Sequence, residues 1–130
     1  MGPVNWWAVG LAAALALTIM AAWDGSLFRR SRARRGRAGR VQPGLLTNAV
    51  VFGLAAVMLG HNFARIGAAT LDSRPWLYFM QTGGVALFFV IPAVWLIHAR
   101  NRAEPLRRVI DCGVLLLAYL AMGVVFWLMG

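Results

Sequence analysis

The sequence has few charged residues and no lysine. Aspartate and glutamate together number four and every cation is an arginine, so charged residues make up only 13% of the 130 residues. That is about half the share usual in a soluble domain. Hydrophobic residues reach 61%, and a soluble fold would need far more polar surface to cover them. We therefore expect a membrane protein.

The residues that usually mark catalysis are also missing. Cys112 is the single cysteine, which excludes an internal disulfide, a Cys-x-x-Cys motif and a thiolate zinc site. The sequence has no glycine-rich phosphate loop and no Ser/His/Asp order typical of hydrolases. We therefore expect no enzymatic activity, no catalytic residue, no bound metal and no resident cofactor.

Four apolar segments of 21 to 23 residues follow one another along the chain: residues 6–28, 45–66, 76–98 and 109–129. At roughly 1.5 Å per residue, a helix of this length measures about 30–35 Å and can cross the hydrocarbon core of a bilayer. Helices are expected because open strands would leave backbone groups unpaired in lipid. The sequence predicts an all-α, polytopic membrane protein, in which residues 1–130 form one domain, a bundle of four transmembrane helices.

Most of the arginines lie on one side of this predicted bundle. Seven of them stand in the segment 29–44, the basic loop: Arg29, Arg30, Arg32, Arg34, Arg35, Arg37 and Arg40. Four more lie in the segment 99–108, whereas only Arg65 and Arg74 lie between the second and third helices. Short loops rich in arginine stay in the cytoplasm. We therefore expect a multi-pass protein of the bacterial inner membrane with both basic segments cytoplasmic and both termini periplasmic.

Three interpretations of the basic loop stay open. It can be a topology signal joined to a solvated linker. Its arginines can bind anionic lipid head groups, at about 1 kcal/mol per arginine near the surface. They can also dock to an acidic face of a partner subunit. Nucleic-acid binding is not expected, because no aromatic residues are interleaved with the arginines.

Small residues indicate how the helices pack. One face of the second helix carries them at spacings of three and four: Ala49, Gly53, Ala56, Gly60 and Ala64. Such faces let helices approach closely in lipid, and Gly10 and Ala14 are expected to do the same in the first helix. Pro92 is expected to kink the third helix or to be accommodated by its neighbours. Packing within the chain is the favoured interpretation of the small faces, and dimerisation is the alternative.

No ionisable residue lies at mid-depth in a predicted helix. Asp24 is in the last turns of the first helix, five residues before Arg29, and Asp111 opens the fourth helix, four residues after Arg107. Both carboxylates are interpreted as interfacial partners of arginines. A proton-driven transporter normally keeps an ionisable group inside the membrane, so this pattern argues against a small multidrug antiporter.

A polar patch is predicted near the periplasmic surface. It joins His61, Asn62 and Arg65 from the end of the second helix to Gln81 and Thr82 from the start of the third. In antiparallel helices, His61 and Gln81 would each lie about 7 Å inside the interface. The patch is interpreted as an interhelical hydrogen-bond network, and contact with a head group, a quinone or another solute is an alternative.

His61 is also a candidate metal ligand, because neutral imidazole is the commonest protein ligand of metals. A haem or chlorin metal held by His61 alone is the third interpretation of the patch. A haem held between His61 and His98 of one chain is excluded, because His98 is expected at the opposite membrane face.

Three stretches of the sequence carry a family resemblance: NWWAVGLAAALALTIMAAWDGSLF, FFVIPAVW and LRRVIDCGVLLLAYLAMGVVFWLMG. They resemble the domain-of-unknown-function 1761 family, small bacterial four-helix membrane proteins. The matching positions are Asn5, Trp6, Trp23, Leu27, Phe28, Phe89, Val90, Pro92, Ile110, Asp111, Gly113, Met122 and Gly123. Asp24, Ser26 and Val114 depart from the family pattern, and the basic loop has no counterpart in it. The resemblance implies four helices, and it implies no catalytic residue because the family has no assigned activity.

Two functional hypotheses follow from these features. The first is a non-enzymatic accessory subunit of a larger energy-transducing membrane complex, respiratory or photosynthetic, in contact with anionic lipids. The second is a small oligomeric transporter or a lipid- or quinone-binding protein that uses the polar patch. Co-purification in gentle detergent distinguishes them, since the first predicts larger partner subunits and the second predicts self-association with bound lipid or solute.

Overall fold

The computed structural model describes residues 2–23 and 44–130, and these form helices and short connections without any strand. In chain order the helices are α1 (Trp6–Ala22), α3 (Leu45–Ile66), α4 (Ala68–Ser73), α5 (Trp76–Val85), the π-helix η2 (Ala86–Val90), α6 (Ile91–Arg100) and α7 (Pro105–Met129). Three helical stretches, residues 45–66, 76–100 and 105–129, are long and apolar enough to cross a membrane, and α1 is a shorter apolar helix. The prediction of an all-α, multi-pass membrane protein is confirmed.

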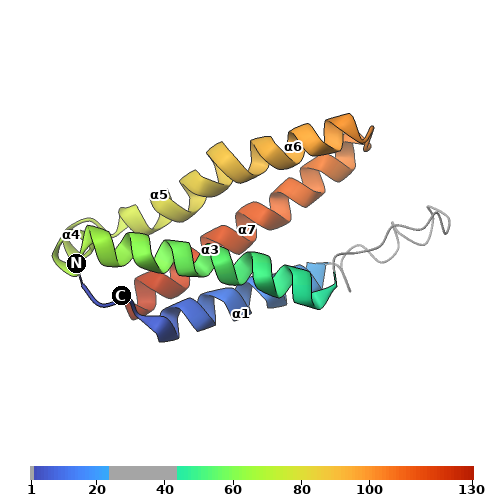
Figure 1. The fold of residues 1–130 in the computed structure, drawn as a ribbon. Coiled ribbons are helices and arrows are strands. Elements are labelled where there is room, and N and C mark those ends of the chain that lie inside the picture. The colour runs from blue at the N-terminus through green and yellow to red at the C-terminus, as the bar shows by residue number, and fades with distance from the viewer. Residues whose placement is uncertain (1, 24–43) are drawn as a thin grey trace.

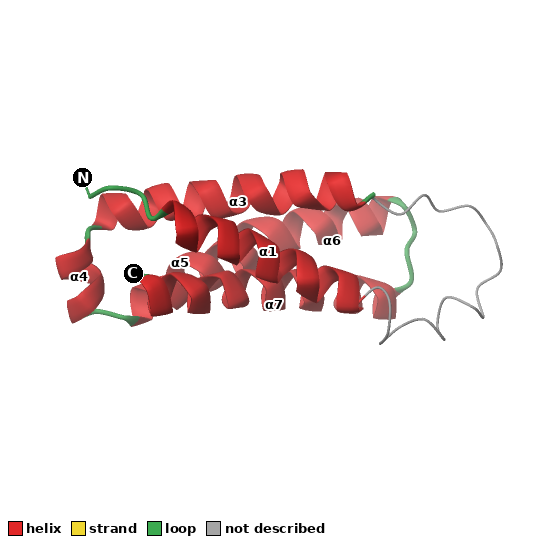
Figure 2. Cartoon of the chain, turned by 90° about the horizontal axis from the view of Figure 1, so that it is seen from below, coloured by secondary structure: helices red, strands yellow, loops and turns green. Residues whose placement is uncertain are grey.

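The helices run alternately in opposite directions. In Figure 1, α1 and the continuous stretch α5–η2–α6 run away from the end that holds both chain termini, and α3 and α7 run back towards it. α1 packs between α3 and α7, and α7 packs against α5 and α6. Figure 2 shows the same bundle from below, with α4 closing the end at which α3 turns into α5. The two termini therefore lie together, and the α6–α7 turn lies at the opposite end.

The predicted helix boundaries agree with the structure to different degrees. The predicted segment 45–66 is α3, which ends where Gly67 adopts a positive φ of 87°. The third helix continues two residues past its predicted end, and α7 begins four residues before its predicted start because proline is well suited to the first turn of a helix. The helix α4 was not predicted. The last part of the predicted first helix, residues 24–28, lies outside the described residues.

The core is a seam of small and aromatic side chains between α1, α3 and α7. Ala8, Ala12 and Ala16 stand one turn apart on α1 and are buried. Nearer the terminal end, the ring of Phe63 lies 4.9 Å from that of Tyr78 and 5.0 Å from that of Phe126. Alanine on one helix against rings on its neighbours lets the backbones approach while the rings fill the remaining volume.

Two glycines mark the closest approaches between helices. A Cβ atom on Gly60 of α3 would lie 2.6 Å from Cγ2 of Val9 on α1, and one on Gly123 of α7 would lie 2.5 Å from Oγ1 of Thr82 on α5. Real Cβ contacts are not this short, so a larger residue at either position requires the facing side chain or the helix to shift. The small face predicted for α3 is therefore confirmed at Gly60, where it packs against α1.

In the first helix, the small face predicted from Gly10 and Ala14 does not pack within the chain, so the favoured interpretation is wrong there and the alternative of contact with another chain is not tested. Gly10 and Ala14 are exposed, and a Cβ atom on Gly10 would meet nothing within 4 Å. The face that packs instead carries Ala8, Ala12 and Ala16. A helix this rich in alanine has small residues on more than one face, so small size alone did not identify the buried one.

Pro92 follows directly after the π-helical turn η2. Proline has no N–H and cannot donate to the carbonyl four residues earlier, here that of Phe88. The N–H of Ile91 donates to Ala86, five residues back, so the turn before Pro92 is widened. This turn accommodates the proline without ending the helix, as single π turns do in membrane helices.

Exposed tryptophans gather near the ends of the bundle. Trp6, Trp7, Trp76 and Trp127 lie in the first or last turns of helices at the terminal end, and Trp95 lies towards the other. Tryptophan is enriched at both membrane–water interfaces. Between these positions the outer surface carries leucine, valine, methionine and phenylalanine, which suits contact with lipid.

Candidate functional site

In the structure, the residues of the predicted polar patch are not hydrogen-bonded to one another. Within residues 2–23 and 44–130, no hydrogen bond or ion pair joins any two of its five members: His61, Asn62, Arg65, Gln81 and Thr82. Thr82 is fully buried, faces Gly123 and donates its hydroxyl to the carbonyl oxygen of Tyr78 at 2.9 Å. Its role is therefore to fill the interface between α5 and α7.

His61 lies on the outer surface of α3, beside the start of α1. Its Nδ1 is 2.9 Å from the carbonyl oxygen of Val57, and its ring meets that of Trp6 edge to face at 5.8 Å. Because a carbonyl can only accept, Nδ1 is the donor, and Nε2 of the neutral ring then carries the lone pair. His61 presents a hydrogen-bond acceptor on an exposed surface near the terminal end.

The residues around His61 form a stripe along α3. Leu54, Met58 and Arg65 are exposed and lie at spacings of three or four residues from His61 or from each other, so they share one side of the helix. An apolar strip that ends in an acceptor and a cation suits an amphiphilic molecule, with its tail beside Leu54 and Met58. This observation keeps the lipid- or quinone-binding alternative open.

Asn5 ties the two chain ends together. Its side-chain oxygen accepts from the N–H of Ala8 at 3.1 Å, which caps α1, and its amide nitrogen donates to the carbonyl of Met129 at 2.8 Å. The cap satisfies one of the free N–H groups of α1, and the second bond satisfies a free carbonyl at the end of α7. Asn5 therefore fixes the start of α1 against the end of α7.

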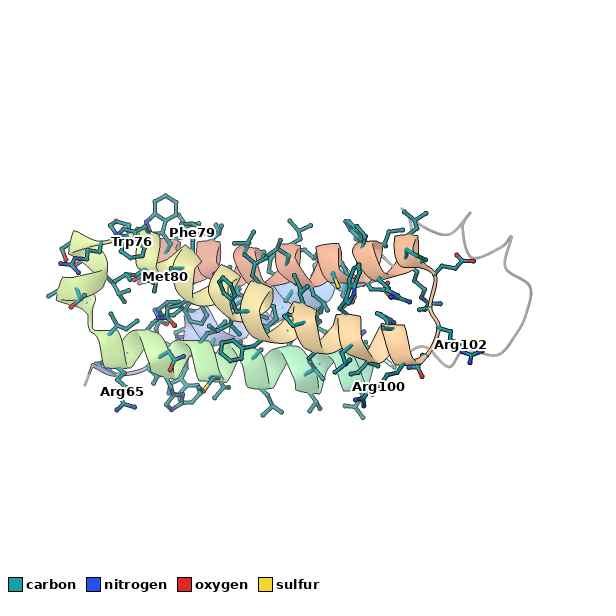
Figure 3. All side chains as sticks on the ribbon, turned by 90° about the horizontal axis from the view of Figure 1, so that it is seen from above. Arg65, Trp76, Phe79, Met80, Arg100 and Arg102 are labelled. Atoms are coloured by element: carbon teal, nitrogen blue, oxygen red, sulfur yellow. The ribbon has the colours of Figure 1, made fainter. Side chains whose placement is uncertain are left out.

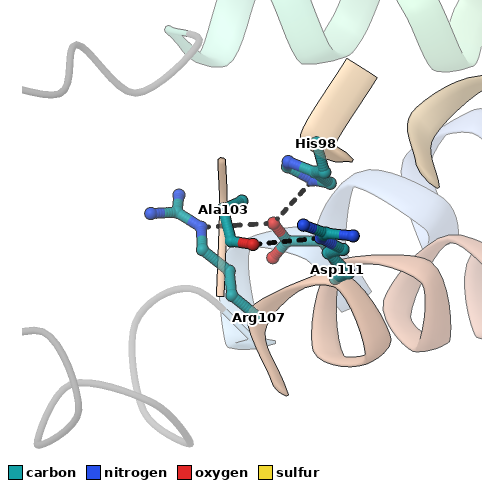
Figure 4. A network of polar contacts seen from close by, with 5 residues as sticks. His98, Ala103, Arg107 and Asp111 are labelled. Carbon is teal, nitrogen blue, oxygen red and sulfur yellow. Dashed lines mark hydrogen bonds and ion pairs between the residues drawn. The ribbon is translucent and has the colours of Figure 1, made fainter. Parts of the chain in front are cut away.

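A second polar cluster, at the α6–α7 turn, joins His98, Arg107 and Asp111. Nε2 of His98 lies 3.0 Å from Oδ2 of Asp111, and Nε of Arg107 lies 3.4 Å from the same oxygen (Figure 4). The pairing of Asp111 with Arg107 was predicted from their spacing and is confirmed. The contribution of His98 was missed, because it comes from the preceding helix and depends on how the turn folds.

Arg108 makes two further contacts at the α6–α7 turn. Its Nε donates to the carbonyl of Ala103 at 3.0 Å, and its guanidinium carbon lies 5.7 Å from the centre of the Trp95 ring. Of the ten residues of α6, all of them described, none is buried. Trp95 and His98 therefore contact α7 from a helix that has no buried residue.

In the part of the chain that the structure describes, no three His, Cys, Asp or Glu residues are placed to hold a metal ion. Asp24 and the seven arginines of the basic loop, at positions 29, 30, 32, 34, 35, 37 and 40, lie outside the described residues, so the three interpretations of the loop stay open.

Comparison with known proteins adds no relative. No family model matches the sequence, and no curated protein or solved structure shows significant similarity to it. The resemblance to the domain-of-unknown-function 1761 family stays a prediction, based on the residues quoted above.

Proposed function

We propose that this chain is a non-enzymatic accessory subunit of a larger membrane complex. The proposal includes a topology in which α1 also crosses the bilayer, with both termini periplasmic and the α6–α7 turn cytoplasmic, in the inner membrane of a bacterium. Its support is that α1 packs against both α3 and α7, that both termini lie at one end (Figure 1), and that Arg100, Arg102, Arg107 and Arg108 lie at the other.

The observation that carries the proposal is the outward face of α1. Gly10, Ala14 and Thr18 are exposed at spacings of four residues, so they form one stripe along the helix. The hydroxyl of Thr18 donates to the carbonyl of Ala14 at 2.9 Å and thus needs no other partner. A small, smooth stripe allows another transmembrane helix to pack closely, and the helices that the structure describes leave it uncovered.

An energy-transducing assembly, respiratory or photosynthetic, is the class of complex that we propose. The chain is small, its predicted spans carry no ionisable group at mid-depth, and its arginines are concentrated on one side. A chain with these properties contributes packing surface and charge to an assembly whose chemistry is carried by other subunits.

The second candidate is a small oligomeric transporter or a lipid- or quinone-binding protein. The exposed Nε2 acceptor of His61, one helical turn from Arg65 and above Leu54 and Met58, favours it. Here the head group of the bound molecule would donate to Nε2 of His61 and accept from Arg65, with its apolar part along α3.

Purification from native membranes in a gentle detergent, followed by mass spectrometry of the intact assemblies, tests the proposal. The accessory-subunit proposal predicts reproducible recovery with larger membrane subunits, including haem-bearing or pigmented ones. Recovery as isolated copies or homodimers carrying a lipid or another small molecule contradicts it and supports the second candidate.

A further inference from the structure

The turn between α6 and α7 places an arginine where the backbone favours glycine. The N–H of Ala103 donates to the carbonyl of His98 at 2.9 Å, and the N–H of Arg102 donates to that of Ala99 at 3.1 Å. These are the two hydrogen bonds of a Schellman motif, in which the residue at the position of Arg102 is most often glycine. Arg102 has a φ of 51°, the only positive φ among the described residues other than glycine.

An unfavourable backbone conformation at a residue other than glycine suggests that the side chain has a function. Arg102 is exposed, as is Arg100 two residues earlier, and within residues 2–23 and 44–130 neither side chain makes a hydrogen bond or an ion pair. Figure 3 shows Arg100 at the end of α6 and Arg102 in the turn that follows it, both at the end of the bundle. Their donors are therefore available to a ligand, in contrast to those of Arg108, which bind Ala103 and stack on Trp95.

The start of α7 adds to the positive potential at this turn. The helix is 25 residues long and its N-terminus has no side-chain cap, and free N–H groups at a helix N-terminus attract anions. Asp111 is already paired with His98 and Arg107, and Glu104 is the other acidic residue of the turn. Four arginines against these two carboxylates leave the turn with a positive charge.

The helical turns of α6 and α7 on either side of these charges carry exposed apolar side chains. Leu106 and Val109 of α7 are 64% and 57% exposed, and Leu96 and Ile97 of α6 are exposed as well. Positive charge above exposed apolar surface matches a phospholipid, whose phosphate accepts from arginine while its acyl chains follow the helices. Free phosphate or an acidic peptide would use only the charged part of this surface.

We propose that the α6–α7 turn is a binding site for an anionic phospholipid, with Arg100 and Arg102 donating to its phosphate and Leu96, Ile97, Leu106 and Val109 contacting its acyl chains. The site is distinct from the basic loop and is built on described residues. Lipid binding at this site requires only that α6 and α7 end at a membrane surface. The lipid proposal can therefore be tested separately from the partner proposed for α1.

The test uses the purified full-length protein, with lipid added back in detergent and thermal unfolding as the readout. The site variant combines Arg100→Gln with Arg102→Gly. The charge control is Arg74→Gln, which is compared with Arg102→Gly alone, because each removes one charge from an exposed residue and the two residues lie at opposite ends of the bundle. All forms are also made with Arg32, Arg34, Arg35 and Arg37 changed to Gln, so that lipid binding by the basic loop does not hide the effect.

Phosphatidylglycerol is expected to raise the unfolding midpoint of the wild type more than phosphatidylcholine does. The site variant should bind phosphatidylglycerol about 30-fold more weakly, the factor that corresponds to two arginines at about 1 kcal/mol each, while the control keeps most of its response. Without lipid, Arg102→Gly should unfold at the same temperature or higher, because glycine suits a positive φ, so a lost response is not a folding defect.

Three results overturn the proposal. The first is an equal loss of response in Arg102→Gly and the control, since net charge would then explain the binding. The second is an equal thermal shift from inorganic phosphate alone, since no acyl chains would be needed. The third is a site variant that keeps its affinity for phosphatidylglycerol but no longer co-purifies with a partner protein. Arg100 and Arg102 would then serve a contact with that protein.

Discussion

Nε2 of His98 on α6 lies 3.0 Å from Oδ2 of Asp111 on α7. This pair joins a helix without buried residues to the helix that it packs against. Arg107 shares the same oxygen at 3.4 Å, and the side chains are only partly exposed, 19% for His98 and 35% for Asp111. The cluster is therefore expected to contribute more than a fully exposed ion pair.

Asp111→Ala should lower the free energy of unfolding by about 1–2 kcal/mol, because it leaves His98 and Arg107 without their shared acceptor. The measurement is thermal or denaturant unfolding in detergent. Asp72→Ala, which removes an exposed carboxylate on α4, is the matched control and should change stability little. Purely additive effects in a double-mutant cycle of His98→Ala and Asp111→Ala would show that the pair is not coupled.

The close contacts at Gly60 and Gly123 predict how substitutions at these positions change the stability of the fold. Gly60→Ala and Gly123→Ala should each destabilise the fold by about 1–3 kcal/mol, because the added methyl group overlaps Val9 or Thr82. Gly53→Ala is the control, since its Cβ would meet nothing within 4 Å, and alanine is the better helix former by roughly 0.5–1 kcal/mol. Equal stability of the three variants would mean that α1 and α3, and α5 and α7, do not pack as described.

The distribution of arginines predicts the topology. A reporter that is active only in the periplasm should be active when fused after Gly130 and silent when inserted next to Gly36, in the basic loop. Activity at both positions would mean that an even number of spans, and not the predicted three, separates Gly36 from Gly130. The reversed pattern would place the α6–α7 turn outside.

His61→Gln separates a structural role of His61 from ligand binding. A structural role predicts a mild change, since glutamine also donates and accepts and His61 is exposed, with its hydrogen bond inside α3. A haem or chlorin metal at His61 predicts that the change removes the absorbance of the bound pigment. A quinone, lipid or solute contact predicts lost binding in a protein that stays folded.

Gln81→Leu tests whether the two sides of the predicted patch act together. A shared site predicts that the double variant with His61→Gln is no worse than the more damaging single one. Because the structure shows no hydrogen bond between the patch residues in its described part, we expect independent effects. A non-additive result would show that a ligand joins the two positions.

The sequence predicted those features that depend on long, uniform patterns. α3 was predicted to the residue, because its apolar run lies between Gly44 and Gly67. The turn η2 and the helix α4 carry no such pattern, and the start of α7 was missed because Pro105 and its neighbours extend the helix beyond the apolar run. Length and hydropathy identify a span, whereas its ends depend on caps and turns.

Contacts between helices were harder to predict than the helices themselves. On α1, Ala8, Ala12 and Ala16 form one small face, and Gly10 and Ala14 belong to another. Since both faces allow close approach, the choice depends on the shapes of α3 and α7, which the sequence of α1 does not contain. The same holds for His98, whose contact with Asp111 exists only once the α6–α7 turn has formed.

The most direct test of the proposed function compares Gly10→Leu with Gly113→Leu in gentle-detergent pull-downs from native membranes. Both glycines are exposed, and a Cβ at either would meet nothing within 4 Å, so both variants should fold. If α1 docks a partner helix through its outward stripe, Gly10→Leu should lose the larger subunits while Gly113→Leu and the wild type retain them. Retention of the same subunits by both variants, or recovery of the wild type without any larger subunit, would contradict the proposal.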